Sequence, residues 1–457
     1  MDPNLRRRSF IGGSLATMLG LAGCNDISRP PDSNELTENL QQQAGTGTPN
    51  ATFIIGHRDG RTVSIDGTTG EIQEAAPAGE EDARVIQRTF DAIPNGGGGV
   101  FIENGTYEIG RYDQWNAGVK IHTSNTVVSS NFARLRFHEH SPEAEFLMDF
   151  AVGAVENVTI EGLIVDGNRT ERSNPTRTID ISESSNVAVR DCVIFGGRRI
   201  KQEGGAGYGI GPYEVNHLTV TNCLITDSDR HGIHPGANDG VYRDVRIHGN
   251  TFIGNARNPT GAAIDVRDRT KDVFITGNYI AENGNGIRMK GVETGDVRIS
   301  GNVVRENRNE EDASAQIEVV AKGFGRYDIS ENILVLESGG GEMETRQIFA
   351  SPSGDSDSLI IRDNDVRGGD SFLEVRDQGA LSYIDVVDNT ATETSHGVIV
   401  EGVETTLVRD NAFRSIEEPA VLPERSQGAV VNNYYLDSPP ADDLSERGFV
   451  TRGNLRL

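Results

Sequence analysis

Tyr208-Gly-Ile-Gly-Pro-Tyr213 is the first of four short segments that together decide the fold of this chain. It is followed by His231-Gly-Ile-His-Pro235, Ala263-Ile-Asp-Val-Arg267 and Gly286-Ile-Arg-Met-Lys290. Each segment has an isoleucine near its centre, and these isoleucines lie 23, 31 and 23 residues apart. Because side chains alternate between the two faces of a β-strand, the isoleucines should face a core while the polar residues beside them face outward.

The strand unit also recurs outside this region, for example as Val158-Thr-Ile-Glu-Gly162, Val245-Arg-Ile-His-Gly249 and Val297-Arg-Ile-Ser-Gly301. The residue after each unit belongs to a column with spacings of 21 to 32 residues: Leu163, Cys192, Cys223, Asn250, Asn278, Asn302, Asn332, Asn364, Asn389, Asn411 and Asn432. An inward asparagine at a turn can bond the backbone of its own turn and of its neighbours. We therefore predict an all-β chain that forms a right-handed parallel β-helix with an asparagine ladder. In the same column, Cys192 and Cys223 should stack as buried thiols, with a disulfide as the alternative.

The β-helix is predicted over residues 100–436, with residues 437–457 as a C-terminal tail. Residues 52–99 are predicted to form a small N-terminal cap, made of a hairpin within residues 52–74 and a helix over residues 80–93. In that helix the apolar residues recur at helical spacing, and acidic residues occupy its first turn. The helix should cover the open end of the coil.

The first 24 residues are predicted to be an export signal and not part of the fold. Arg7-Arg8-Ser9-Phe10-Ile11 resembles a twin-arginine motif, and the apolar run after it is too short to span a bilayer. It ends in Leu21-Ala-Gly-Cys24, which resembles a lipobox with Cys24 as the lipidated residue. Residues 25–51 are polar and are predicted to be a linker. The chain should therefore lie on the extracellular face of the membrane, held by a lipid anchor.

The charge of the chain is strongly negative, with a formal value of −26. This charge argues against nucleic acid or an anionic membrane surface as a partner. Only five of the 43 basic residues are lysine. Such a composition resembles the acidic proteins of salt-loving organisms, including archaea, in which salt screens a large charge. An ordinary acidic secreted protein is the alternative.

Ionisable and aromatic side chains gather on the outward face of the predicted strands. Relative to the inward isoleucine, the next position holds His234, Asp265, Arg288 and Glu318, and the position three residues on holds Tyr213, Arg267 and Lys290. Two positions before it stand Tyr208 and His231. Successive rungs lie about 4.8 Å apart, so His234 should lie beside Asp265, and Arg288 should lie between Asp265 and Glu318.

This set fits the removal of the C5 proton of a uronate sugar. That reaction needs a cation to neutralise the carboxylate, a base, and an acid for the leaving oxygen. We assign Tyr208, His231, His234, Asp265 and Lys290 as catalytic candidates, and Tyr213, Arg267, Arg288 and Glu318 as candidates for substrate binding. In the alternative interpretation, Arg267 and Lys290 merely pair with Asp265, Asp268 or Glu318. Hydrolysis is disfavoured, because it needs two carboxylates closer together than the rungs place Asp180 and Asp265.

The asparagine column, together with the glycine-rich approach to Asn104-Gly-Thr-Tyr107, resembles the pectin-lyase-like β-helix superfamily over roughly residues 80–435. That superfamily contains polysaccharide lyases, polygalacturonase-type hydrolases, uronan epimerases and proteins without enzymatic activity. The resemblance therefore implies the fold, and it does not by itself select one of these functions. Calcium often assists such enzymes. Asp265, Asp268 and Glu318 are the candidates for its ligands, although no spacing here demands a calcium cage and no cofactor is required.

A closer resemblance concerns Tyr208-Gly-Ile-Gly-Pro-Tyr-Glu214, which is similar to the Y-G-F-D-P-H-E motif of mannuronan C5-epimerases. The resemblance carries the catalytic tyrosine of that family onto Tyr208. The aspartate and histidine of the motif fall on Gly211 and Tyr213, which cannot do the same work. The sequence thus favours a β-eliminating lyase. The alternatives are a carbohydrate-binding or structural surface protein without activity, and a hydrolase or epimerase of the same fold.

Overall fold

The structure is a computed structural model that describes residues 51–79, 81–110, 117–138, 147–169, 174–198, 206–236, 242–256, 261–308, 314–336, 345–376, 381–417, 421–424, 427–438 and 449–456. It divides into two compact units. Unit 1 consists of the chain up to His234 together with residues 246–257, and unit 2 consists of residues 235–245 and 258–457. The predictions for the export signal, Cys24 and the linker up to residue 50 lie outside the described residues.

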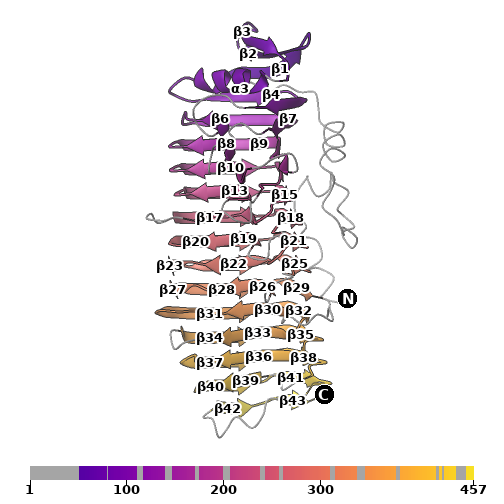
Figure 1. The fold of residues 1–457 in the computed structure, drawn as a ribbon. Coiled ribbons are helices and arrows are strands. Elements are labelled where there is room, and N and C mark those ends of the chain that lie inside the picture. Colours follow the sequence, from indigo (N-terminus) through magenta and orange to yellow (C-terminus); the bar gives the residue numbers. More distant parts are fainter. Residues whose placement is uncertain are drawn as a thin grey trace, which may run out of the picture. The chain divides into compact units, whose positions relative to one another are not determined.

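In both units, short strands stack in parallel to form two sheets (Figure 1). Sheet 2 carries the candidate site. In unit 1 its strands are, in order, β6 (Ala117–Ile121), β8 (Leu147–Gly153), β10 (Thr176–Ser182), β13 (Tyr208–Tyr213) and β16 (His231–Ile233). In unit 2 they are β19 (Ala262–Arg267), β22 (Ile287–Lys290), β26 (Ser314–Val319), β30 (Thr345–Ala350), β33 (Ser371–Arg376), β36 (His396–Glu401) and β39 (Val421–Glu424).

Sheet 1 contains most of the remaining strands. In unit 1 these are β4 (Gly98–Ile102), β5 (Thr106–Ile109), β7 (Thr126–Phe137), β9 (Glu156–Asp166), β11 (Ser185–Arg190), β12 (Val193–Phe195), β14 (Asn216–Thr221), β15 (Leu224–Thr226) and β18 (Thr251–Ile253). Strand β17 (Tyr242–His248) has residues in both units. In unit 2 they are β20 (Thr270–Thr276), β21 (Tyr279–Ala281), β24 (Val297–Ser300), β25 (Val303–Arg305), β28 (Arg326–Ser330), β29 (Ile333–Leu336), β31 (Ser356–Arg362), β32 (Asp365–Gly368), β34 (Leu381–Val387), β35 (Thr390–Thr392), β37 (Thr405–Arg409), β38 (Ala412–Arg414), β40 (Gln427–Val431), β41 (Tyr434–Leu436), β42 (Phe449–Arg452) and β43 (Leu455–Arg456). Two short strands, β23 (Val292–Thr294) and β27 (Lys322–Phe324), pair separately.

The predicted fold class is confirmed: the chain is an all-β solenoid, a right-handed parallel β-helix. Each rung pairs with the next in a parallel register that follows the sequence repeat, as in Ile179↔Ile210 and Ile264↔Ile287. The inward isoleucines form one column within each unit, and each is fully buried: Ile179, Ile210 and Ile233 in unit 1, and Ile264, Ile287, Ile317 and Ile348 in unit 2. Burial of one such side chain contributes about 1.5–3 kcal/mol.

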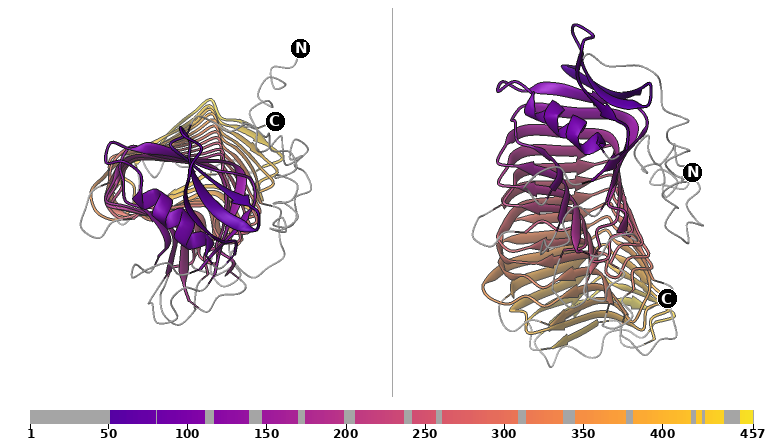
Figure 2. Two further views of the ribbon diagram at one scale, coloured as in Figure 1. Left: turned by 90° about the horizontal axis from the view of Figure 1, so that it is seen from above. Right: turned by 45° about the horizontal axis from the view of Figure 1, so that its top comes forward.

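The N-terminal cap belongs to unit 1 and contains the helix that the sequence predicts. Strands β1 (Phe53–Arg58), β2 (Arg61–Asp66) and β3 (Ile72–Pro77) are antiparallel, and β1 also pairs in parallel with β4. Helix α3 (Asp82–Asp91) lies across the end of the coil, next to these strands (Figure 2). Its apolar residues Val85, Ile86 and Phe90 are buried. The Asp82 carboxylate accepts hydrogen bonds from the backbone N–H groups of Gly79 and Glu108, which ties the helix to the first rung.

The asparagine ladder is present, and in unit 2 it runs without interruption through Asn278, Asn302, Asn332, Asn364, Asn389, Asn411, Asn433 and Asn454. Each side-chain oxygen accepts from the backbone N–H of the asparagine one rung earlier. At Asn332, for example, Nδ2 also donates to the carbonyl oxygen of Ile299 at 2.9 Å. The ladder therefore satisfies backbone groups that would otherwise be buried without a partner.

One member of the predicted column is wrong, because Asn433 and not Asn432 occupies the ladder. Every rung in this region places a residue with positive φ immediately before the ladder asparagine, such as Asp388 and Asp410. Asn432 takes that position with φ 55°. Asparagine tolerates the left-handed conformation better than most residues, so either residue of the Asn432-Asn433 pair fits the pattern by sequence alone.

Two further features of the turns refine the sequence analysis. Asn283 and Asn307 form a second, shorter ladder that ends on the side chain of Gln316, and the sequence analysis missed it. In unit 1, Cys192 and Cys223 occupy the column as free, buried thiols, and burial raises the pKa of Cys223 well above its ordinary value. No helix in the described part of the chain is long and apolar enough to cross a membrane.

The ladder gives a stability prediction for Asn332→Ala. This change leaves the backbone N–H of Asn302 and the carbonyl of Ile299 buried without their partner. Two such groups cost about 2–5 kcal/mol of unfolding free energy. Chemical denaturation followed by circular dichroism measures the loss. The control is Asn95→Ala, at an exposed asparagine, and an equal effect of the two changes would contradict a structural role for the ladder.

Candidate functional site

In unit 1, three neighbouring strands of sheet 2 bring the candidate residues together. The register places Arg177 of β10 opposite Tyr208 of β13, and Tyr208 opposite His231 of β16. These residues occupy the same position of three successive rungs, so they form a column one strand spacing apart. His234 follows β16, and its backbone N–H donates to the carbonyl oxygen of Ile210 at 2.9 Å, which continues the parallel pairing.

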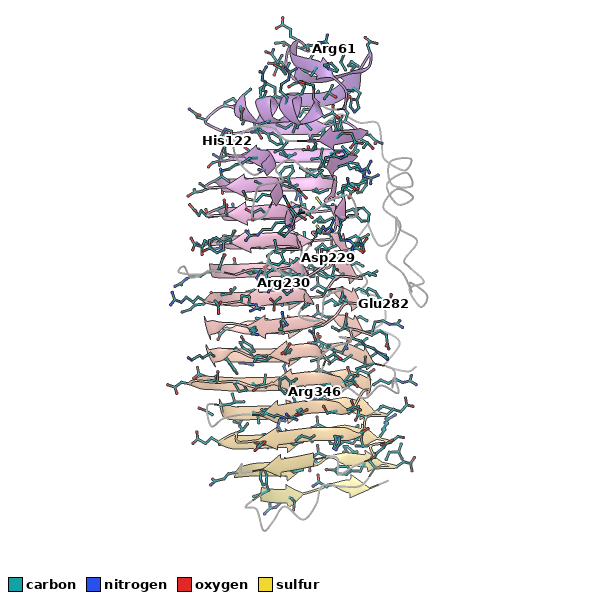
Figure 3. All side chains as sticks on the ribbon, in the orientation of Figure 1. Arg61, His122, Asp229, Arg230, Glu282 and Arg346 are labelled. Carbon is teal, nitrogen blue, oxygen red and sulfur yellow. The ribbon has the colours of Figure 1, made fainter. Side chains whose placement is uncertain are left out.

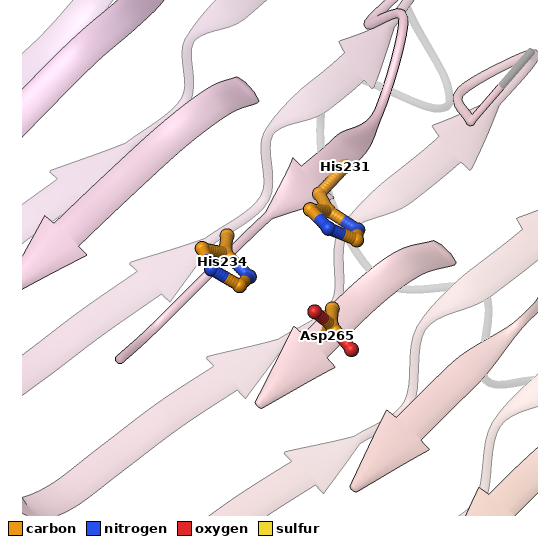
Figure 4. A group of neighbouring side chains, drawn as sticks. All are labelled: His231, His234 and Asp265. Atoms are coloured by element: carbon orange, nitrogen blue, oxygen red, sulfur yellow. The ribbon is translucent and has the colours of Figure 1, made fainter. Parts of the chain in front are cut away.

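Three rings form the centre of this site. The rings of His231 and His234 are stacked, with centroids 4.6 Å apart and an interplanar angle of 9° (Figure 4). The Tyr208 ring lies 4.5 Å from the His234 ring and 5.3 Å from the His231 ring. His231 is fully buried, Tyr208 is 7 % exposed and His234 is partly exposed. His234 is therefore the imidazole that solvent reaches, and His231 lies behind it.

Two guanidinium groups flank the Tyr208 ring, and the sequence analysis named neither of them. The central carbons of Arg177 and Arg230 each lie 5.8 Å from the ring centroid, at the range of cation–π contacts. Arg230 Nη1 also donates to the Tyr208 hydroxyl at 3.2 Å. Arg230 and Asp229 precede β16 (Figure 3). The Tyr208 hydroxyl oxygen thus contacts Arg230, and the Tyr208 ring lies beside both Arg177 and Arg230.

Gly211 is the reason that Arg177 and Tyr208 can approach each other. A Cβ atom at this position would lie 3.0 Å from Cδ of Arg177 and 3.2 Å from Cδ2 of Tyr208, closer than ordinary contacts. The same register places Gly211 opposite Asp180, which accepts from Arg177 Nη1 at 2.6 Å. Because Gly211 has no side chain, the side chains of Tyr208, Arg177 and Asp180 have room to lie beside it.

Asp180 is buried, and burial raises its pKa even though Arg177 and Lys120 both act to lower it. Lys120, two strands away on β6, has a lowered pKa because it is also partly desolvated, and Asp180 opposes that shift. The two groups show that this face of unit 1 is a weakly hydrated environment, in which electrostatic interactions are strong.

In unit 2, Asp265 on β19 (Figure 4) is the centre of a second charged group. Its carboxylate is fully buried and accepts from Nε of Arg267 at 2.7 Å and from Nε of Arg288 at 2.5 Å. Burial acts to lower the pKa of Arg288, but Asp265 and Glu318 raise it and the net shift is upward. Arg267 thus pairs with Asp265, as the alternative interpretation expects, and its role in substrate binding stays a prediction.

The remaining residues of unit 2 lie where the repeat predicts. The register places Arg288 between Asp265 and Glu318, and Arg267 opposite Lys290. Lys290 is exposed, and it makes no ion pair with any residue of the described ranges. Both oxygens of Asp265 accept from guanidinium groups. Calcium binding by Asp265, Asp268 and Glu318 stays a prediction.

The structure therefore brings the predicted residues together in two groups. Tyr208, Tyr213, His231 and His234 lie in unit 1, where Tyr213 is partly exposed at the end of β13, and Asp265, Asp268, Arg267, Arg288, Lys290 and Glu318 lie in unit 2. The expected adjacency of His234 and Asp265 joins the two units and stays a prediction. Of the missed residues, Arg177 had a signal in the sequence, since it occupies the column of Tyr208 and His231 one rung earlier. Arg230 had none.

Comparison with known proteins gives similarity of fold only. No protein-family model and no curated protein matches the chain. Among solved structures, a mutant tailspike protein of E. coli bacteriophage HK620 in complex with a pentasaccharide has a TM-score of 0.46 at 12 % identity, covering 82 % of this chain and 74 % of its own. The A-module of mannuronan C-5 epimerase AlgE6 from Azotobacter vinelandii has a TM-score of 0.42 at 12 % identity, covering 83 % and 96 %. An exopolygalacturonase from Thermotoga maritima has a TM-score of 0.43 at 11 % identity, covering 78 % and 87 %.

The raised pKa of Asp180 predicts how stability depends on pH. A carboxyl group whose pKa is higher in the folded state stabilises the fold below its ordinary pKa of 3.8, and this contribution is lost as pH rises through the folded-state pKa. Asparagine resembles the protonated form. The melting temperature of Asp180→Asn should therefore rise relative to the unmodified protein as the pH increases from mildly acidic to neutral.

Asp66→Asn is the matched control with the opposite sign. Hydrogen bonds from the backbone N–H groups of Thr69 and Thr68 lower the pKa of Asp66, so its carboxylate stabilises the fold above its ordinary pKa. The melting temperature of Asp66→Asn should therefore fall relative to the unmodified protein as the pH rises to the ordinary pKa of 3.8, and it should show no further trend from mildly acidic to neutral pH. Calorimetric scans of both variants measure the two trends, and parallel trends would show that burial does not govern Asp180.

Proposed function

We propose that this chain is an exported, surface-anchored enzyme that cleaves an acidic, uronate-containing polysaccharide by β-elimination. The observation that carries the proposal is the position of the Tyr208 hydroxyl, which accepts from Arg230 at 3.2 Å while its ring lies 4.5 Å from the partly exposed His234. A proton donor, a proton acceptor and a cation thus lie together on one strand face, which is the set that the reaction requires.

In the proposed reaction, an arginine neutralises the sugar carboxylate and so makes the neighbouring C5 proton more acidic. The His234 imidazole takes that proton, and the electron pair left on C5 forms the C4–C5 double bond. The bond between C4 and the glycosidic oxygen breaks, and the Tyr208 hydroxyl protonates the departing oxygen. Arg230, already bonded to the Tyr208 oxygen, stabilises the negative charge that develops there.

The other candidates take supporting roles in this proposal. His231 is fully buried, so it positions the His234 ring through their stacking contact and does not touch the substrate. Asp265 is held by two arginines, so it orients Arg267 and Arg288 and does not transfer a proton. Lys290 is exposed and is the second candidate for the base, with Tyr213 and Glu318 as contacts for the sugar.

The activity test uses the ultraviolet absorbance of the unsaturated uronate product. Alginate, pectate and glycosaminoglycans are the substrates, at high salt, with and without calcium. Tyr208→Phe and His234→Gln should each lower kcat by roughly 10²–10⁴-fold, because each removes a group that transfers a proton. Lys290→Ala should have the same effect only if Lys290 is the base. Tyr434→Phe and His396→Gln, outside the site, are the controls and should leave the rate unchanged.

The other outcomes of this assay contradict the proposal in specific ways. If no polymer gives an absorbance change but one of them still binds, the chain is a carbohydrate-binding surface protein. New reducing ends without unsaturation would indicate a hydrolase. Exchange of the C5 hydrogen with solvent, without chain cleavage, would indicate an epimerase.

The anchoring part of the proposal rests on Cys24 and the apolar run before it. Cys24→Ser removes the only residue of the Leu21-Ala-Gly-Cys24 motif that can be lipidated, so the protein should move from the membrane fraction to the medium. Immunoblots of the two fractions measure this change, and Cys192→Ser is the control for loss of a thiol. Retention of the Cys24→Ser protein in the membrane fraction would contradict a lipid anchor.

A further inference from the structure

Unit 2 contains a second cluster of charged and aromatic side chains that the proposed reaction does not use. It lies on strands β30 and β33, two strands beyond β22 in sheet 2 and therefore about 10 Å from it. Its members are Arg346, Phe349, Glu374 and Arg376. None of these four residues is among the candidates of the sequence analysis.

The geometry of the cluster starts with one carboxylate that two arginines share. Glu374 Oε2 accepts from Nε of Arg346 at 2.5 Å, and Glu374 Oε1 accepts from Nε of Arg376. The guanidinium of Arg346 (Figure 3) also lies 4.6 Å from the centroid of the Phe349 ring. The register places Phe349 directly opposite Glu374 on the neighbouring strand.

Burial distinguishes the supporting members of the cluster from the accessible ones. Arg346 and Glu374 are 8 % and 5 % exposed, so their ion pair and the cation–π contact hold Arg346 in place. Phe349 is partly exposed, and 55 % of the Arg376 side chain is accessible. The Phe349 ring and the Arg376 guanidinium, on neighbouring strands, are therefore accessible to solvent. The buried ion pair of Arg346 and Glu374 contacts both of them.

This combination is the one that proteins use to bind sugars. An aromatic ring packs against the apolar face of a pyranose, and a guanidinium binds carboxylate oxygens in a planar, two-point arrangement. Acidic groups also adjoin the cluster: Glu318 is opposite Phe349 on β26, and Glu401 is opposite Arg376 on β36. Their carboxylates can accept hydrogen bonds from the hydroxyl groups of a sugar, while Arg376 is the group that can bind its carboxylate.

We propose that Phe349 and Arg376, supported by Arg346 and Glu374, form a saccharide-binding site for a uronate sugar that is separate from the Tyr208 site. The proposal shares only its class of ligand with the proposed function. Binding at this site does not require the chain to be an enzyme. For an enzyme on a long polymer, the site would hold the substrate away from the reacting bond and so lower KM without changing kcat.

The test measures binding of oligosaccharides cut from pectate and from alginate, by titration calorimetry. The protein is the full chain carrying Tyr208→Phe and His234→Gln, so that cleavage does not interfere. Adding Phe349→Ala should weaken binding at least tenfold. Adding Arg376→Gln should weaken binding of the uronate oligosaccharides tenfold. The same substitution should weaken binding less than twofold when the carboxylates of these oligosaccharides have been reduced to alcohols.

Matched controls separate this effect from general damage to the surface. Phe274→Ala removes a phenylalanine of comparable exposure on β20, and Arg367→Gln removes an exposed arginine that is also paired with a glutamate. Both should leave binding unchanged. Melting temperatures check that every variant is folded, and Phe349→Leu provides a milder change if Phe349→Ala is not.

Three results would overturn the proposal. Unchanged binding by both cluster variants would show that the sugar binds elsewhere. Equal losses for the charged and the reduced oligosaccharides would remove the assignment to uronates. No binding of any of these sugars would exclude the site. A different result is also informative: the activity assay fails, but the sugars still bind and Phe349→Ala weakens that binding. This result would contradict the proposed enzyme and support this site.

Discussion

The hydrogen bonds between successive rungs are the constraint on which the rest of the molecule depends. Parallel strands keep a fixed spacing of about 4.8 Å. In the ladder of unit 2, each rung has a left-handed residue followed by an inward asparagine, as at Asp388 and Asn389. A side chain on the outer face therefore lies one strand spacing from the equivalent side chain of the next rung. The contact of Asp265 with Arg288 on the next strand follows from this spacing.

The sequence predicts the fold well because the pattern with period two and the turn residues are local features. The inward isoleucines, the ladder and the order of Asp265, Arg288 and Glu318 along the outer face all follow from counting residues. The site is less predictable, because positions at the turns do not obey the alternation. We assigned His231 to the outward face as a residue of the entry turn, yet it lies in β16, two residues before the inward Ile233, and is fully buried. Arg230 reaches Tyr208 from outside the strand altogether.

Charge pairing was the least predictable part of the site. The sequence shows which ionisable residues share a face of the sheet, but it does not show which carboxylate each arginine pairs with. In sheet 2 of unit 2, one buried carboxylate is shared by two arginines at Asp265 and again at Glu374. A buried carboxylate loses hydration free energy that one cation does not always restore, and two guanidinium groups offset it more fully. Arginine suits this role because its donors are fixed in a plane and its charge is weakly hydrated.

Gly211 determines what chemistry the site in unit 1 can support. In the epimerase motif that this segment resembles, the equivalent position carries an aspartate. Here, any side chain would press on Arg177 and Tyr208, whose atoms would lie 3.0 and 3.2 Å from its Cβ. A carboxylate at position 211 would therefore require the arginine and the tyrosine to shift from their present contact. In place of a carboxylate at position 211, the Tyr208 ring has two guanidinium groups and the His234 ring as neighbours. This arrangement is the reason that we propose neutralisation of an anionic sugar over the acid-assisted chemistry of a carboxylate pair.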